Sequence, residues 1–168
     1  GFNACSGIID GDDHTITVPK GSKTMLGAVA GGKLSNLNIY GEKIDGYGVV
    51  EYYYVDRANP VKVEIGNVTL KSGTHTKYSG FIGGYASGVN FVNISNCTVA
   101  KGVNIGVGNT DGFVGSFAGE FNGVITNCTS AATVVGKTCV GGLVAKKGQS
   151  MGPCNIKNCT FTGKVVSE

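Results

Sequence analysis

Acidic side chains that can carry acid–base chemistry are few in this chain of 168 residues, which holds 11 Asp and Glu residues and two His residues. Cleavage of a polysaccharide requires two or three carboxylates gathered on one face. No acidic residue lies between Glu64 and Asp111, and neither Asp111 nor Glu120 has an acidic equivalent in the neighbouring copies of the repeat described below. We therefore expect a protein that is not an enzyme. A polysaccharide lyase or hydrolase that uses Asp111 or Glu120 is the alternative.

Metal-ligating residues are also poorly grouped. His14 and His75 are isolated, and the six cysteines form no Cys-x-x-Cys pair, so a structural zinc site has no support. The run Asp-Gly-Asp-Asp at residues 10–13 lacks the other ligands and the closing Glu of an EF-hand loop. We expect no metal site and no cofactor, and we interpret the aspartates as a polar turn.

One tripeptide recurs at a fixed interval: Asn-Cys-Thr occurs three times, 31 residues apart. The Asn-Cys pairs are Asn96-Cys97, Asn127-Cys128 and Asn158-Cys159. A glycine-rich block precedes each copy at a nearly constant offset, and Asn67 and Asn36 extend the register toward the N-terminus. Asparagine tolerates the left-handed backbone conformation, and its side chain can hydrogen-bond to the next copy. We therefore expect a structural ladder at a turn, rather than the N-glycosylation sites that the tripeptide also matches.

The repeated cysteines have two interpretations. We expect Cys97, Cys128 and Cys159 to form a column of reduced, buried thiols that act as small hydrophobic residues. Disulfides that involve Cys139 and Cys154, which lie outside the register, are the alternative. Six free thiols in the unfolded, unreduced chain would exclude the disulfides.

The composition indicates short strands and many tight turns. The chain has 21 Val and 11 Ile against five Leu, and 29 Gly. Branched side chains suit pleated strands, and no segment shows a sustained apolar helical period. A repeat of about 31 residues built from short strands is typical of a solenoid, in which each copy forms one coil and pairs with the next coil.

The last copy of the repeat resembles the GLUG repeat, through Val-Gly-Gly-Leu-Val-Ala at residues 140–145 and Ile-Lys-Asn-Cys at residues 156–159. That repeat occurs in bacterial secreted and cell-surface proteins, including adhesins and the non-catalytic part of IgA-specific metalloproteases. The resemblance is good over residues 79–166 and weak over residues 26–78. It implies a surface-exposed parallel β-helix without conserved catalytic residues.

The opening residues 7–18 resemble the turn found at the first coils of right-handed parallel β-helices, although Asp12-Asp13 departs from the usual pattern. We predict an all-β chain folded as a single-stranded right-handed parallel β-helix, with about 31 residues per coil and five or six coils. Residues 1–168 are predicted to form a single domain. Because both ends look open, we expect a fragment of a longer surface protein.

The clearest break in the repeat lies at residues 51–60, which hold three of the seven tyrosines and the only arginine. Insertions in repeat proteins often lie in loops on a binding face, and Tyr and Arg are favoured at binding sites. We take Tyr52, Tyr53, Tyr54 and Arg57 as candidate binding residues. A strand with alternate tyrosines in the core is the alternative.

These observations favour a β-helical scaffold or adhesin of a bacterial secreted or cell-surface protein, which binds host glycans or host surface proteins. Its 13 lysines are scattered, so we expect no nucleic-acid partner. No apolar run approaches the length that spans a bilayer, so we expect no membrane-spanning segment. A carbohydrate-active β-helix, or the non-catalytic β-helical region of a secreted protease, is the alternative function.

Overall fold

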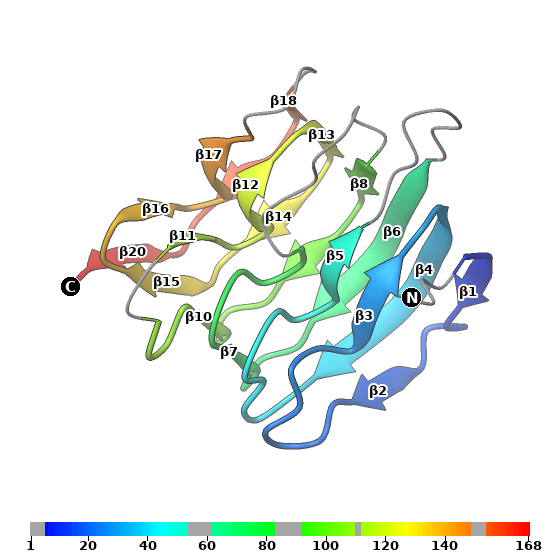
Figure 1. Cartoon of the computed structure of the whole chain (residues 1–168), viewed down its shortest axis with the longest axis horizontal. Helices are drawn as coiled ribbons and strands as arrows, with labels where there is room; N and C mark the ends of the chain where they lie inside the picture. Colours follow the sequence, from blue (N-terminus) through cyan, green and yellow to red (C-terminus); the bar gives the residue numbers. More distant parts are fainter. Residues whose placement is uncertain (1–5, 54–61, 83–91, 110–111, 149–153) are drawn as a thin grey trace.

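A computed structural model describes residues 6–53, 62–82, 92–109, 112–148 and 154–168. Within these ranges the chain contains strands and loops and no helix. The strands wind into a β-solenoid of about 5 turns, with equivalent positions about 29 residues apart. In Figure 1 the coils are stacked along the longest axis, from the blue first coil to the red last coil. The prediction of an all-β, parallel β-helical chain is confirmed.

The largest sheet, which we call the first sheet, is parallel and runs the length of the solenoid. Its strands are β1 (Ile8–Asp10), β2 (Thr15–Thr17), β4 (Gly32–Tyr40), β6 (Val63–Leu70), β8 (Val92–Ser95), β9 (Thr98–Val99), β13 (Gly123–Thr126), β14 (Thr129–Ser130), β18 (Cys154–Lys157) and β19 (Thr160–Phe161). Alternate side chains of β8 point into the core, because successive residues of a strand face opposite sides of the sheet.

Two further sides close each coil. The second sheet contains β7 (His75–Thr76), β10 (Asn104–Ile105), β15 (Thr133–Gly136) and β20 (Lys164–Ser167). The third side contains three strand pairs: β3 (Leu26–Val29) with β5 (Val50–Tyr53), β11 (Phe113–Gly115) with β16 (Cys139–Gly141), and β12 (Ala118–Phe121) with β17 (Val144–Lys147). All of these pairings are parallel, as expected when each strand lies beside its equivalent in the next coil.

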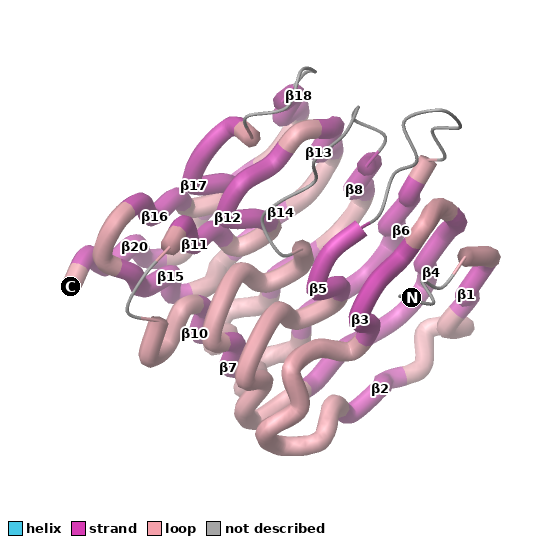
Figure 2. The backbone as a smooth tube through the Cα atoms, viewed as in Figure 1, coloured by secondary structure: helices cyan, strands magenta, loops and turns pink. Residues whose placement is uncertain are grey.

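The coil length varies more than the sequence repeat predicts. On the first sheet, Ile94 pairs with Ile65 in the preceding coil and with Ile125 in the following coil, and these two intervals are nearly equal. On the third side, the stretch of chain from Ile82 to its partner Ala118 is much longer than the stretch from Ala118 to its partner Val144. The predicted repeat of about 31 residues therefore describes the first sheet, whereas intervals on the third side are unequal. Figure 2 shows the strands of successive coils side by side, with loops joining the sides of each coil.

The core is a continuous apolar column enclosed by the three sides. Ile39, Leu70 and Val99 stack in register and are fully buried. Phe81 and Phe117 are also fully buried, with ring centroids 4.8 Å apart. Burial of each large apolar side chain contributes roughly 1.5–3 kcal/mol, so the apolar stack stabilises the coils.

Candidate binding surface

The recurring asparagines all adopt the left-handed backbone conformation. The φ angles of Asn36, Asn67, Asn96, Asn127 and Asn158 lie between 51° and 54°. Asn67 donates from Nδ2 to Oδ1 of Asn36 over 3.0 Å, and Asn36 donates from Nδ2 to Oδ1 of Asp10 over 3.1 Å. The structure therefore places these residues at one turn of each coil, and the first three coils share a side-chain ladder.

The repeated cysteines follow these asparagines and point into the core. Cys97 and Cys128 are almost completely buried, and Cys159 in the last coil is half-buried. Each thiol donates to the backbone carbonyl two residues earlier. Cys97 donates to the carbonyl of Ser95 and Cys128 to that of Thr126, both at 3.2 Å. The backbone N–H of Cys97 also donates to Sγ of Cys128 at 3.4 Å.

Hydrogen bonds and burial shift the thiol pKa values of the column in different directions, and a hydrogen bond with Cys97 lowers the pKa of Cys128. A hydrogen bond to Cys128 and desolvation raise the pKa of Cys97 above its usual range. Desolvation also raises the pKa values of Cys159 and of Cys154. The five cysteines in the described ranges, including Cys139, are free thiols. Since a nucleophilic cysteine needs an accessible thiolate, these residues are better suited to packing than to covalent chemistry.

The candidate binding residues on the third side are described only in part. Strand β5 pairs Tyr52 with Ala28 and Tyr53 with Val29 through the backbone. The side chains of Tyr52 and Tyr53, and the whole of Tyr54 and Arg57, lie outside the described part of the structure. The tyrosine and arginine hypothesis therefore stays a prediction.

Of the two carboxylates considered for catalysis, the structure describes only that of Glu120. Glu120 lies on β12 with 10% of its side chain exposed and makes an ion pair of 3.2 Å with Lys146 on the neighbouring strand β17. Lys146 Nζ also lies 4.4 Å from the ring centroid of Phe113. Asp111 lies outside the described residues. The ion pair and the surrounding side chains hold the Glu120 carboxylate away from solvent.

The aspartates of the opening stretch form a compact polar turn. Asp12 and Asp13 have φ angles of 47° and 58°, and the backbone N–H of Asp12 donates to Oδ1 of Asp10 at 3.1 Å. This hydrogen bond and the one from Asn36 hold the pKa of Asp10 below its usual value. Among the described residues, no group of three His, Cys, Asp or Glu side chains has an arrangement suited to a metal ion.

A polar groove of about 450 Å³ crosses the outer face of the first sheet. We define it by six of its lining residues: Lys33, Ser35, Glu64, Gly66, Asn93 and Ser95. Two columns of register-equivalent residues build it, one of Lys33, Glu64 and Asn93 and the other of Ser35, Gly66 and Ser95. Gly66 lacks a side chain between the two serines, which hollows the groove at its centre.

A search for catalytic motifs does not identify the groove residues, but their position in the repeat does. Lys33, Glu64 and Asn93 each stand three residues before a left-handed asparagine. Alignment of the coils on those asparagines places the three residues in one outward column. Because equivalent positions of successive coils lie about 4.8 Å apart, the column presents different polar groups at close and regular intervals.

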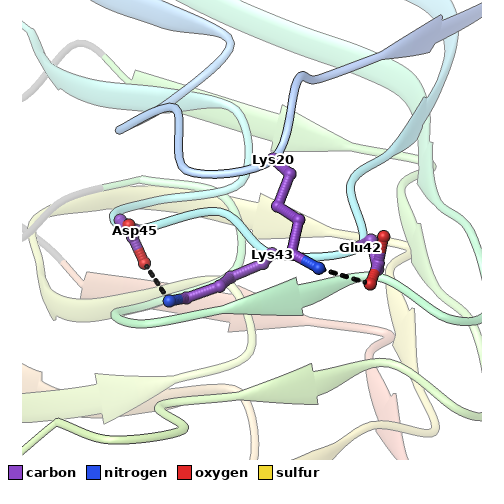
Figure 3. A network of polar contacts seen from close by, with 4 residues as sticks. All are labelled: Lys20, Glu42, Lys43 and Asp45. Carbon is purple, nitrogen blue, oxygen red and sulfur yellow. Dashed lines mark hydrogen bonds and ion pairs between the residues drawn. The ribbon is translucent and has the colours of Figure 1, made fainter.

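A second, charged groove of about 340 Å³ lies on the outside of the second sheet. Figure 3 shows two ion pairs at this groove: Lys20 with Glu42 at 3.0 Å, and Lys43 with Asp45 at 3.5 Å. All four side chains are well exposed, so each pair contributes at most about 1 kcal/mol. The paired charges satisfy one another, and the polar groove is therefore the stronger candidate for a ligand.

Comparison with known proteins gives one match. Residues 136–166 match the family model described as the GLUG motif. The matched range contains the last Asn-Cys pair, Asn158-Cys159, and most of the strands of the last coil. No curated protein and no solved structure matches the chain. No helix in the described ranges is long and apolar enough to cross a membrane.

Proposed function

We propose that this chain, whose residues 136–166 match the GLUG motif, is a non-catalytic scaffold or adhesin module of a bacterial secreted or cell-surface protein, which binds host glycans in the polar groove. The observation that carries the proposal is the composition of the groove. Hydroxyl, amide, ammonium and carboxylate groups of five side chains surround the gap at Gly66. Sugar hydroxyls both donate and accept hydrogen bonds, and such a mixed set of donors and acceptors matches them.

The geometry of the solenoid supports an extended glycan as the ligand. Equivalent side chains recur at about 4.8 Å along the groove, which is comparable to the length of one sugar unit. Strands β4, β6 and β8 are hydrogen-bonded to one another and hold the outward side chains in fixed register. A preorganised surface loses little conformational entropy on binding, which favours recognition of a flexible chain of sugars.

The proposal of a non-catalytic role rests on the acids near the groove. Glu64 is the one carboxylate among the described residues that line it. Glycosidases in general use a pair of carboxylates across the scissile bond, one as acid and one as base or nucleophile. Glu120 is engaged with Lys146 on the third side of the solenoid. A single carboxylate beside polar amides suits binding of an intact sugar better than its cleavage.

The test fills the groove at its centre. Gly66 has no positive φ, and a Cβ there would lie 3.5 Å from Oγ of Ser95, so Gly66→Gln places a side chain in the groove without backbone strain. Gly27→Gln is the matched control, because a Cβ at Gly27 meets nothing within 4 Å and β3 lies on another side. An oligosaccharide array identifies the glycan, and calorimetry then measures its Kd for each protein.

We expect Gly66→Gln to weaken glycan binding by at least about tenfold and Gly27→Gln to leave it unchanged. Incubation of the wild type with the bound oligosaccharide should release no new reducing ends or unsaturated products. A wild type that binds no glycan, or a Gly66→Gln variant that binds as tightly as the wild type, would overturn the glycan proposal. Cleavage of the oligosaccharide would instead support the carbohydrate-active alternative.

A further inference from the structure

Folding gathers lysines that are scattered in the sequence onto one side of the solenoid. Each pass of the chain along the second sheet and its flanking turns contributes at least one lysine. We call this group the lysine face, and its members are Lys20, Lys23, Lys43, Lys71, Lys77, Lys101, Lys137 and Lys164. The described residues of the same passes hold only three acidic side chains, those of Glu42, Asp45 and Glu168. Since the whole chain has a formal net charge of +3, this side carries a positive excess that the other sides do not share.

The second sheet directs polar side chains outward between these lysines. Its inward positions are buried, as Ile105 and Val134 are. The residues before them belong to one outward register column, which runs Lys43, His75, Asn104, Thr133, Lys164. Four strand spacings separate the first and last members of the column, which is roughly 19 Å. The lysine face is therefore a long polar strip that follows the solenoid axis.

Most of the lysine face has no counter-charge. Figure 3 shows the two pairs that exist, Lys20 with Glu42 and Lys43 with Asp45, and both are exposed and therefore weak. The other six lysines make no ion pair with any residue that the structure describes: Lys23, Lys71, Lys77, Lys101, Lys137 and Lys164. All of these side chains are exposed except that of Lys77, which is half-buried. A row of unpaired like charges attracts an anionic ligand and concentrates it at the surface.

We propose that the lysine face binds a linear acidic polysaccharide, which lies along the solenoid axis with its carboxylate or sulfate groups on the lysines. The coils repeat at about 4.8 Å, which is comparable to the length of one sugar unit. An acidic polysaccharide carries its charges at intervals of whole sugar units, so its spacing suits lysines that recur from coil to coil. The lysine face lies on a different side from the polar groove, and the proposal does not depend on what that groove binds.

An aromatic pair beside the lysines adds a surface for sugar rings. The rings of Tyr47 and Tyr78 lie with their centroids 5.1 Å apart, and both residues are half-buried. Lys77 Nζ lies 5.6 Å from the ring centroid of Tyr78, so a cation and an aromatic ring stand together there. The charged groove of about 340 Å³ begins at Lys77 and includes the exposed Val107. Apolar carbon atoms beside cations suit a sugar ring that carries an acidic group.

The same features fit other polyanions less well. Duplex DNA carries one negative charge per about 1.7 Å of helix axis, which is far denser than lysines set at strand spacing. Binding to an anionic membrane surface requires apolar area as well as positive charge. Of the exposed large apolar side chains in the described ranges, only that of Val107 lines this groove. Charge spacing and the small apolar area therefore favour a polysaccharide.

Calorimetry with probes of defined chemistry tests the proposal. Heparin hexasaccharide presents sulfates and carboxylates, oligogalacturonate presents carboxylates alone, and neutral dextran fragments present neither. We expect at least one of the acidic probes to bind, the dextran not to bind, and binding to weaken with added salt. Heparin fragments should bind more tightly from disaccharide to hexasaccharide, because the longer fragments span more coils. A wild type that binds neither acidic probe, or that binds the disaccharide as tightly as the hexasaccharide, would overturn the proposal.

Two triple variants with the same change in charge locate the site. Lys71→Gln, Lys101→Gln and Lys164→Gln together remove three exposed lysines of the lysine face, and we expect binding to weaken by about tenfold or more. The matched control combines Lys62→Gln, Lys147→Gln and Lys157→Gln, which are exposed on the other sides and should leave binding unchanged. Circular dichroism checks that both variants fold. Equal losses in the two triple variants would contradict the assignment to the lysine face.

Two further comparisons separate this site from its alternatives. Gly66→Gln fills the polar groove and should bind the acidic probe as the wild type does, so failure of one proposal leaves the other standing. A short DNA duplex and vesicles that contain phosphatidylserine are measured at the same salt concentration. Both should bind more weakly than the acidic oligosaccharide. Equal or tighter binding of the duplex or of the vesicles would overturn the choice of a polysaccharide.

Discussion

Asn67 donates a hydrogen bond from its side-chain Nδ2 to Oδ1 of Asn36, 3.0 Å away and one whole coil earlier in the chain. Both residues have a φ of 53°, so the same left-handed turn recurs in both coils and brings the two amides into register. The ladder links a local backbone preference to the stacking of coils, and it predicts the effect of substitutions at the turn.

Substitution of Asn67 should separate the contribution of the left-handed backbone conformation from that of the side-chain hydrogen bond. Asn67→Ala keeps a Cβ in the left-handed conformation and loses the amide, so we expect it to lower the free energy of unfolding by about 1–3 kcal/mol. Asn67→Gly loses the amide but adopts the conformation freely, so its loss should be smaller. Urea unfolding followed by circular dichroism measures both. Asn93→Ala, in the adjacent column, should change stability by less than about 0.5 kcal/mol. Equal losses for Ala and Gly would contradict a role for the backbone conformation.

A glycine at the corner of the third side should tolerate no side chain. A Cβ at Gly80 would collide with the backbone carbonyl oxygen of Ser116 in the next coil, while a Cβ at Gly27 has open space. We expect Gly80→Ala to destabilise the protein by about 2 kcal/mol or more, because the coils would have to separate locally. Gly27→Ala should be neutral or slightly stabilising, since it only restricts the unfolded chain. Thermal unfolding of the two variants provides the comparison, and similar melting temperatures would argue against the close approach.

The first coil should become less stable in acid because of Asp10. The backbone N–H of Asp12 and the amide of Asn36 hold the pKa of Asp10 below its ordinary value of 3.8 in the folded state. The stabilising contribution is therefore present above pH 3.8 and is lost as the pH falls through the lower folded pKa. Carbon-13 NMR of the carboxyl group should give a pKa below 3.8. The stability difference between the wild type and Asp10→Asn should shrink over the same pH range, and an unshifted carboxyl pKa would refute the assignment.

Thiol reactivity should follow position in the cysteine column. Cys97 and Cys128 are 1% and 0% exposed, so they should react with a disulfide reagent only after local opening of the fold. Cys139, Cys154 and Cys159 are half-buried and should react sooner. Desolvation raises the pKa of Cys154, so its alkylation at a given pH should be slower than that of a free cysteine. Mass spectrometry of labelled peptides resolves the sites. In denaturant without reductant, fewer than six reactive thiols would indicate a disulfide.

Much of the fold could be predicted because its signals are local and repeated. The regular interval of Asn-Cys-Thr predicts the coil, and the left-handed φ of Asn96, Asn127 and Asn158 follows from the known tolerance of asparagine. The excess of Val and Ile predicts the strands that stack in the core. The coil length on the third side was less predictable, since the interval from Ile82 to Ala118 is longer than the sequence repeat although it contains the copy at Asn96-Cys97-Thr98.

The candidate site was predicted less well than the fold. The tyrosine and arginine segment stays a prediction, and no catalytic motif identifies the polar groove. Lys33, Glu64 and Asn93 are dissimilar residues, and none of them is conspicuous in its own coil. They share a surface only because β4, β6 and β8 pair in one register, across two intervals of unequal length. A one-residue error in either interval would move part of the predicted column from the outer face of the sheet to the face that packs on the core.

The sequence alone therefore determined the repeating unit, its left-handed asparagine turn and its apolar inward positions, because each depends on residues close together in the chain. Tertiary structure decided which residues of different coils stand side by side: the gap at Gly66 between Ser35 and Ser95, and the ion pair of Glu120 with Lys146. Those relationships depend on strand register accumulated over whole coils and on loops of unequal length, and neither is encoded in any short stretch of sequence.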